Sequence, residues 1–257
     1  MANAFLLDLG RCIGCQACVV ACKTGNELDE GTQYIRILEQ VRGTFPNLAG
    51  GFDNHRCYHC ADAACVAVCP THALFKEDGL TRLDREVCSG CGYCIETCPY
   101  GVPELVDGRS SKCDACAATT KAGGDPWCVT TCPSRALMYG DRDEILAEAN
   151  ARVAVMQRRY PNAQVYGETQ AGGLGVIMVV PDDPEVLDLP LQPDPPLVAQ
   201  AWQKVVQPGS IALTGATIAA AGVAAVIARR NHMAELEAIE HAEAGVATGT
   251  ADTTEEV

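Results

Sequence analysis

The chain has 257 residues, of which 48% are hydrophobic and only 5% aromatic. Its formal net charge is −14, from 19 basic and 33 acidic residues, which argues against a surface that binds nucleic acid. All 16 cysteines lie between Cys12 and Cys132, and we expect them to supply the order that a core poor in aromatic side chains lacks.

The first residues contain no recognisable export signal. Residues 1–8 have neither a basic region nor a long apolar run, and no twin-arginine pair occurs there, which by itself predicts a cytoplasmic protein. A short strand is expected at 5–9, directly before the first cysteines. Residues 23–56 form an insertion, with a strand expected at 34–38 and a loop at 43–51.

The cysteines form four groups of four. The third group, from Cys88 to Cys98 and followed by Pro99, has the spacing C-x2-C-x2-C-x3-C-P of bacterial ferredoxins, which predicts a [4Fe–4S] cluster. In two-cluster ferredoxins the fourth cysteine of such a group ligates the neighbouring cluster. The other spacings are x2-x2-x3 in the first group, x2-x4-x3 in the second and x2-x11-x3 in the fourth. A short hairpin is expected between the second and third groups, at 74–81.

Two other interpretations of the cysteines are less favoured. An even number of cysteines also occurs in disulfide frameworks, mostly in short secreted domains. Structural zinc takes four ligands from two CxxC pairs, whereas three cysteines spaced C-x2-C-x2-C and followed by Cys-Pro are unusual for zinc. Sixteen thiolates, at four per cluster, therefore predict four [4Fe–4S] clusters.

No other residues suggest a catalytic site. The sequence contains no nucleophile–base pair, phosphate-binding loop or dinucleotide fingerprint, and its five histidines lack the spacing of an open metal site. His59, inside the second group, either tunes a cluster by hydrogen bonding or is an ordinary loop residue. Tyr58, Tyr93 and Trp127 either shield clusters from water or simply pack. Because saturated clusters bind no substrate, we expect a non-catalytic electron-transfer subunit, with catalysis on a partner.

The cysteine-free remainder predicts a helix, a strand and a membrane anchor. Asp141 and Glu144 form a capping box before a helix that ends at Tyr160-Pro161, and a strand is expected at 176–180. The 19 uncharged residues 210–228 would span roughly 28 Å as a helix, close to the hydrocarbon thickness of a bilayer. The alternative is a buried, alanine-rich helix of a soluble domain.

These segments predict an α+β chain. Its expected parts are a four-cluster ferredoxin-like domain at 1–140, a helix–strand extension at 141–180, a proline-rich linker at 181–207, a transmembrane helix at 208–230 and a disordered acidic tail at 231–257. Arg229 and Arg230 follow the apolar segment and favour a cytoplasmic C-terminus, with the cysteine domain on the outer side.

The spacing of the four groups over residues 5–140 resembles the four-cluster iron–sulfur subunits of molybdopterin oxidoreductases and of some [NiFe] hydrogenases. The remaining segments are similar to those of the beta subunit of the membrane-bound respiratory formate dehydrogenase. Subunits of the dimethyl sulfoxide reductase type usually lack the anchor and have tryptophan at one cysteine of the third group, whereas Cys94 is present here. The segment before Cys12 is shorter than the leader of the formate enzyme.

This resemblance implies two ferredoxin-like halves in a pseudo-two-fold arrangement, the first group pairing with the fourth and the second with the third. The ligand sets that it implies are Cys12, Cys15, Cys18 and Cys132; Cys22, Cys113, Cys116 and Cys128; Cys57, Cys60, Cys65 and Cys98; and Cys69, Cys88, Cys91 and Cys94. It also implies a molybdenum or tungsten pterin catalytic subunit, a multi-helix cytochrome b that reduces quinone, and a place in the bacterial inner membrane. Export would then use the twin-arginine signal of the catalytic subunit, leaving the cluster domain on the periplasmic side.

We therefore expect the chain to relay electrons from a formate-oxidising subunit to the membrane. One alternative is the same role in a [NiFe] hydrogenase or in an oxidoreductase of sulfur or arsenic compounds. An alternative from a different class is a zinc-stabilised scaffold protein.

Overall fold

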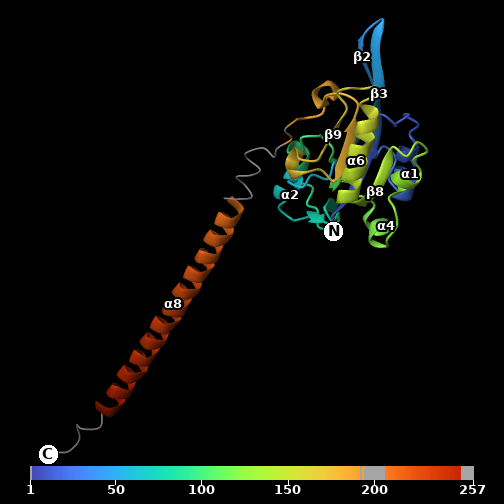
Figure 1. Ribbon diagram of the computed structural model, residues 1–257. Helices are drawn as coiled ribbons and strands as arrows, with labels where there is room; N and C mark the ends of the chain where they lie inside the picture. Colours follow the sequence, from blue (N-terminus) through green and yellow to red (C-terminus); the bar gives the residue numbers. More distant parts are fainter. Residues whose placement is uncertain (1, 192, 194–205, 250–257) are drawn as a thin grey trace, which may run out of the picture. The chain divides into compact units, whose positions relative to one another are not determined.

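The computed structural model describes residues 2–191, 193 and 206–249. The chain divides into two compact units, Met1–Trp202 and Gln203–Val257, each of which is described by itself. All sixteen cysteines lie in the first unit, together with every strand of the described residues, and the second unit contains one long helix (Figure 1).

The first unit is built mainly from short elements. In chain order they are β1 (Asn3–Asp8), α1 (Ala17–Gly25), β2 (Ile35–Thr44), β3 (Asn47–Arg56), α2 (Ala64–Ala67), β4 (Leu74–Glu77), β5 (Leu80–Leu83), α3 (Tyr93–Glu96), β6 (Glu104–Val106), β7 (Arg109–Ser111), α4 (Ala117–Lys121), α5 (Trp127–Thr130), β8 (Leu137–Asp141), α6 (Arg142–Met156), β9 (Gln164–Tyr166), η1 (Gln170–Gly172), β10 (Val176–Val180) and η2 (Pro184–Leu187).

A four-stranded sheet with the order β8-β1-β10-β9 organises this unit. Strands β1 and β10 are parallel, while β8 and β9 pair with them antiparallel at the two edges. Parallel neighbours bury both faces, and accordingly β10 is a continuous apolar run without an exposed residue. The strand expected at 176–180 is confirmed.

Alternation along the strands divides the sheet into two apolar faces, because successive side chains of a strand point to opposite sides. Ala4, Leu6, Ile177 and Val179 pack against α6. The opposite set, which includes Phe5, Leu7, Val176, Met178 and Val180, packs against the buried cysteines Cys18, Cys22 and Cys128. One face of the sheet is thus covered by a helix and the other by the cysteine loops.

Helix α6 begins where the capping signal predicted. The Asp141 carboxylate accepts a hydrogen bond from the Asp143 backbone N–H at 2.9 Å. The expected boundary between 1–140 and 141–180 lies within this sheet, because β10 is placed between β1 and β9. Residues from both ranges fill one core, and both ranges fall within the same compact unit.

The insertion before the second cysteine group is a long hairpin. Strands β2 and β3 pair in register from Ile35 with Arg56 to Thr44 with Asn47, so the loop expected at 43–51 is wrong. Figure 1 shows the far end of this hairpin projecting from the body of the unit. The short hairpin expected at 74–81 is β4–β5.

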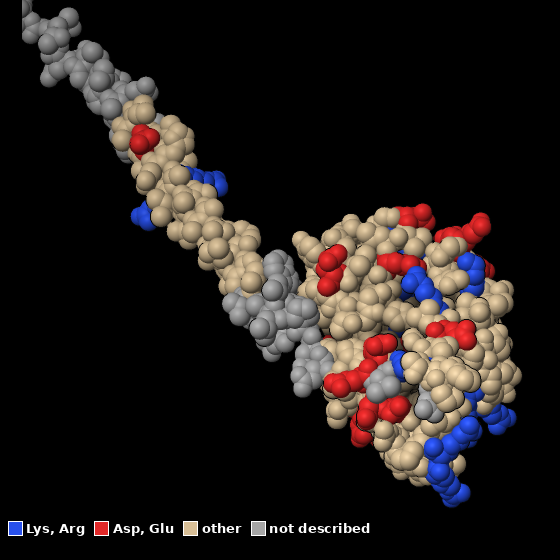
Figure 2. All heavy atoms as spheres, turned by 90° about the horizontal axis from the view of Figure 1, so that it is seen from above, with Lys and Arg blue, Asp and Glu red and all other residues tan. Residues whose placement is uncertain are grey.

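The second unit is dominated by α8 (Gln207–Gly249). Within it, Gly209–Ile239 is long and apolar enough to cross a membrane by length and composition, with a mean hydropathy of 2.1. Figure 2 shows an uncharged surface along the start of this helix, and the first charged residues of α8 are Arg229 and Arg230. The expected helix end at 230 and the disordered tail are wrong for 231–249, where the helix continues; 250–257 lie outside the described residues. Residues 192 and 194–205 of the expected linker also lie outside the described residues, whereas η2 lies in its described part.

Candidate functional site

The four cysteine groups share one backbone conformation. In each CxxC pair that opens a group, the residue before the second cysteine has a positive φ: 66° at Gly14, 51° at His59, 70° at Gly90 and 59° at Ala115. Only glycine adopts this left-handed conformation without a steric penalty, so at His59 and Ala115 the surrounding structure must hold it in place. The repeat detected in the spacing is therefore also a repeat in the loop geometry.

Two cavities are each lined by four cysteines that come from two groups. The first is lined by Cys12, Cys15, Cys18 and Cys132. The second is lined by Cys69, Cys88, Cys91 and Cys94. In each, three cysteines come from one group and the last cysteine of another group completes the set. No charged side chain lines either cavity, so the donor set is thiol with an otherwise neutral wall, which fits an iron–sulfur cluster.

The other eight cysteines line neither of these two cavities, and five of them are buried. The Asn26 amide lies 3.5 Å from the Cys22 sulfur and 3.7 Å from the Cys116 sulfur, which brings the first and fourth groups together. The Arg56 guanidinium lies 3.6 Å from the Cys128 sulfur and 3.9 Å from that of Cys113. These four sulfurs are therefore gathered around two donors.

The remaining set combines the second group with the last cysteine of the third. Burial raises the pKa of the Cys60 thiol, and the neighbouring Cys57, Cys65 and Cys98 raise it further. Among the described residues, no group of three or more side chains is close enough to hold a single metal ion. The cysteines thus surround spaces and do not converge on a point.

Burial is the main influence on the thiols. It raises the pKa of Cys18 to about 11, against a smaller lowering by the positive charge of Arg56. It raises the pKa of Cys65 to about 12, against a lowering by Lys112. Thiolates are the form that binds iron, so a bound cluster must supply the positive charge that keeps these groups deprotonated.

Several donors to sulfur were not foreseen from the sequence. The Ser110 backbone N–H donates to the Cys88 sulfur at 3.3 Å, and the Ser110 hydroxyl lies 3.4 Å from the Cys94 sulfur. The Asn54 amide lies 3.8 Å from the Cys18 sulfur, 36 residues away in sequence. The only local signal was that Asn54 and Arg56 immediately precede Cys57.

Among the described residues, the His59 ring forms no hydrogen bond to a thiol. Its buried ring stacks on Phe5, with the ring centroids 6.1 Å apart, and its Nδ1 lies 3.2 Å from the Thr81 backbone nitrogen. Burial lowers its pKa well below the ordinary value. Of the three aromatic residues inside the groups, Tyr58 is buried and stacks on Tyr100, whereas Tyr93 and Trp127 are partly exposed.

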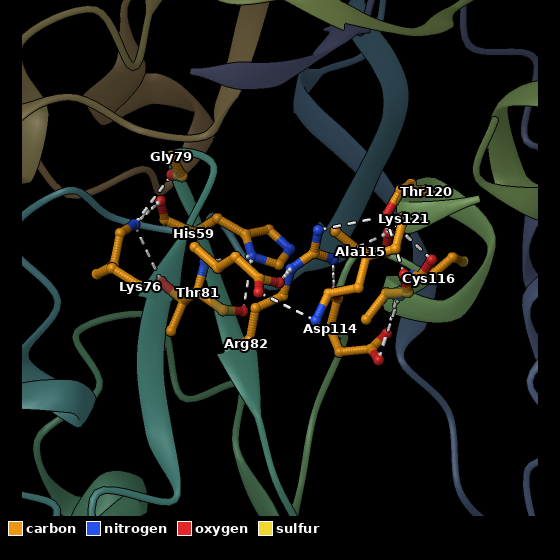
Figure 3. Close-up of polar contacts among 12 residues, drawn as sticks. His59, Lys76, Gly79, Thr81, Arg82, Asp114, Ala115, Cys116, Thr120 and Lys121 are labelled. Atoms are coloured by element: carbon orange, nitrogen blue, oxygen red, sulfur yellow. Dashed lines mark hydrogen bonds and ion pairs between the residues drawn. The ribbon is translucent and has the colours of Figure 1, made fainter. Parts of the chain in front are cut away.

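Strands β4 and β5 hold two of the cysteine loops at a fixed separation (Figure 3). Lys76 donates to the carbonyl oxygens of His59 and Cys60, at 3.3 and 2.7 Å, in the second group. Arg82, on the neighbouring strand, donates to the carbonyl oxygen of Asp114 in the fourth group. The hairpin therefore ties the backbone of the second group to that of the fourth.

Comparisons with known proteins match the cysteine-containing part of the chain to iron–sulfur domains. Two family models, both described as 4Fe-4S dicluster domains, match residues 11–74 and 48–142. The "Protein NrfC homolog" of Haemophilus influenzae is 39% identical over 58% of this chain and 69% of its own length. The "Formate dehydrogenase iron-sulfur subunit" of the same organism is 31% identical over 84% of this chain and 78% of its own length. The "Thiosulfate reductase electron transfer subunit PhsB" of Salmonella typhi is 39% identical over 66% and 88%.

The alignments extend over most of each relative. The two family-model matches together contain all sixteen cysteines. This chain therefore belongs to the family of iron–sulfur electron-transfer subunits of the molybdopterin oxidoreductases.

Proposed function

We propose that the sixteen cysteines bind four [4Fe–4S] clusters, each held by three cysteines of one group and one cysteine of another, in the four ligand sets given above. The first and fourth groups then form one half of the domain and the second and third groups the other, and the two halves are related by a pseudo-two-fold axis. The observation that carries this proposal is that two cavities are each lined by four cysteines, three from one group and one from another. When bound, each cluster accepts and donates one electron. The protein residues orient the thiolates and exclude water.

Exposure and proximity of the sulfurs support a linear relay. Cys15 and Cys91, in the two cavities, are exposed, whereas Cys22, Cys113, Cys116 and Cys128 are buried. Electrostatic interactions couple Cys18 to Cys128, Cys113 to Cys57, and Cys65 to Cys94, each pair joining one set to the next. The outer clusters, at Cys15 and Cys91, then exchange electrons with partner proteins and the two inner clusters connect them.

The source of the electrons is a molybdenum or tungsten pterin subunit that oxidises formate. The support is the extent of the match, since the formate dehydrogenase subunit aligns over 84% of this chain and the thiosulfate reductase subunit over 66%. The same relay in a hydrogenase or in an oxidoreductase of sulfur or arsenic compounds is the alternative. In the purified complex, formate should reduce the clusters; reduction by hydrogen or reoxidation by thiosulfate, with no response to formate, would favour the alternative.

The electrons leave to a membrane cytochrome b that reduces quinone, beside which α8 crosses the inner membrane. The support is the apolar stretch Gly209–Ile239, ending in a segment that carries Arg229 and Arg230. These arginines favour a cytoplasmic C-terminus and a periplasmic cluster domain, exported with the twin-arginine signal of the catalytic subunit. A reporter fused after Val257 should stay cytoplasmic, and its export would reverse this orientation.

Metal analysis tests the clusters directly. About sixteen iron and sixteen acid-labile sulfide per chain are expected from four cubane clusters, and a content dominated by zinc would instead support a scaffold protein. Cys98→Ser tests the crossing, because it should alter the spectrum of the cluster held by Cys57, Cys60 and Cys65. Cys94→Ser is the matched control from the same group and should alter the other cluster. The crossed ligation is wrong if both variants alter the same cluster.

A further inference from the structure

Arg56 is a fully buried cation among the cysteines. It ends β3 directly before Cys57, and only 1% of its surface is exposed. One guanidinium nitrogen lies 3.6 Å from the Cys128 sulfur and the other lies 3.9 Å from the Cys113 sulfur. The guanidinium carbon also lies 4.5 Å from the centroid of the Phe5 ring, which closes its other side.

No carboxylate of the described residues is paired with this charge. The other buried arginines of the described residues are paired: Arg82 with Glu77 at 3.4 Å, and Arg152 with Asp8 at 3.3 Å. No ion pair in the part of the chain that the structure describes includes Arg56, and its Nε atom has no hydrogen-bond partner there. An unpaired buried charge is strongly destabilising, so a negative group must lie where the two thiols are.

The strand register explains why the guanidinium reaches a neighbouring set of cysteines. Arg56 pairs with Ile35 at the base of the β2–β3 hairpin, which anchors its backbone next to Cys57. Its side chain nevertheless extends to Cys113 and Cys128, which lie 57 and 72 residues away in sequence and belong to a different ligand set. Arg56 therefore connects the ligand set that contains Cys57 with the set that contains Cys113 and Cys128.

We propose that the buried positive charge of Arg56 raises the reduction potential of the cluster held by Cys22, Cys113, Cys116 and Cys128. The inference rests on the ligand sets of the proposed function. When that cluster gains one electron from a neighbouring cluster, which is oxidised by one electron, its negative charge increases by one unit. A fixed cation bonded to two of its thiolates stabilises the reduced form more than the oxidised form, since hydrogen bonds to sulfur and net charge set such potentials.

Redox titration of the complete complex, followed by electron paramagnetic resonance, tests this proposal. Arg56→Met removes the charge and leaves an apolar side chain that needs no partner, and Arg56→Lys keeps the charge. Cys116→Ser identifies the signal of the relevant cluster in advance. Arg36→Gln is the matched control, because it removes an arginine from the same hairpin whose side chain is 47% exposed.

In Arg56→Met, the equilibrium for reducing this one cluster should weaken at least tenfold, about 59 mV for one electron, while the other three signals shift less. Arg56→Lys should retain most of the wild-type potential, and Arg36→Gln all of it. If Arg56→Met does not assemble clusters, Arg56→Gln replaces it, with the same expectation.

Three results would overturn the proposal: an unchanged potential in Arg56→Met, an equal shift of all four signals, or a shift in Arg56→Lys as large as in Arg56→Met. Iron content separates this failure from failure of the proposed function. About sixteen iron atoms per wild-type chain with an unshifted signal refute only the role of Arg56, whereas a wild-type chain without four clusters refutes the ligand sets.

Discussion

Two glycines of the third cysteine group offer a sharp test of the loop geometry. Gly90 and Gly92 both have positive φ, 70° and 78°, so alanine at either position should cost about 1–2 kcal/mol in backbone strain. Around Gly92 nothing lies within 4 Å of an added Cβ, whereas at Gly90 the Cβ would overlap the backbone carbonyl oxygen of Gly108. A backbone atom cannot rotate away, so Gly90→Ala must push the β6–β7 hairpin from the loop.

That displacement would break the contacts of Ser110 with the sulfurs of Cys88 and Cys94, at 3.3 and 3.4 Å. At roughly 1 kcal/mol per hydrogen bond, Gly90→Ala should be less stable than Gly92→Ala by about 2 kcal/mol, before any cost of the clash itself. For a unit of this size the difference corresponds to an apparent melting temperature roughly 4–8 °C lower at one scan rate. Gly90→Ala should also lose about four of sixteen iron atoms. Equal melting temperatures and full iron content in both variants would refute this reasoning.

Further predictions concern the sheet and its surroundings. Arg152→Met should lower the free energy of unfolding by about 3 kcal/mol, because it leaves the buried Asp8 carboxylate without its buried partner. Adding Asp8→Asn should restore part of this loss in denaturant titrations, and no recovery would contradict the pairing. The hydrogen bond from Asn162 lowers the pKa of Asp182, so this bond stabilises the fold above the ordinary pKa of 3.8 and loses its effect as pH falls through the lowered value. Asn162→Ala should therefore destabilise the protein more at about pH 6 than at about pH 3, and a pH-independent effect would argue against it. After iron removal, amide hydrogen exchange should accelerate in the cysteine loops earlier than in α6, because the core between α6 and the sheet contains no cysteine. Simultaneous loss of protection in both regions would contradict this separation of the two faces of the sheet.

Part of the fold could be predicted because its signals are local. The capping residue Asp141 and the apolar run 176–180 identify α6 and β10 from a few neighbouring residues. The features that local signals did not indicate depend on pairing between separate chain segments. The segment 43–51 forms strands because each half pairs with the other across a turn, and 141–180 joins the cysteine unit because β10 pairs with β1.

The sequence by itself determined how many thiols there are, how they are spaced and which chemistry they suit, because a CxxC loop is a local arrangement that few residues define. It also determined the family, through the succession of four such groups. Only the tertiary structure decided that Cys132 lines a cavity with Cys12, Cys15 and Cys18, and that Arg56 lies against Cys113 and Cys128. These contacts join residues far apart in the chain, and they arise from the packing of the loops on one face of the sheet. Spacing therefore identifies the ligands, whereas packing determines which of them meet and which charges surround them.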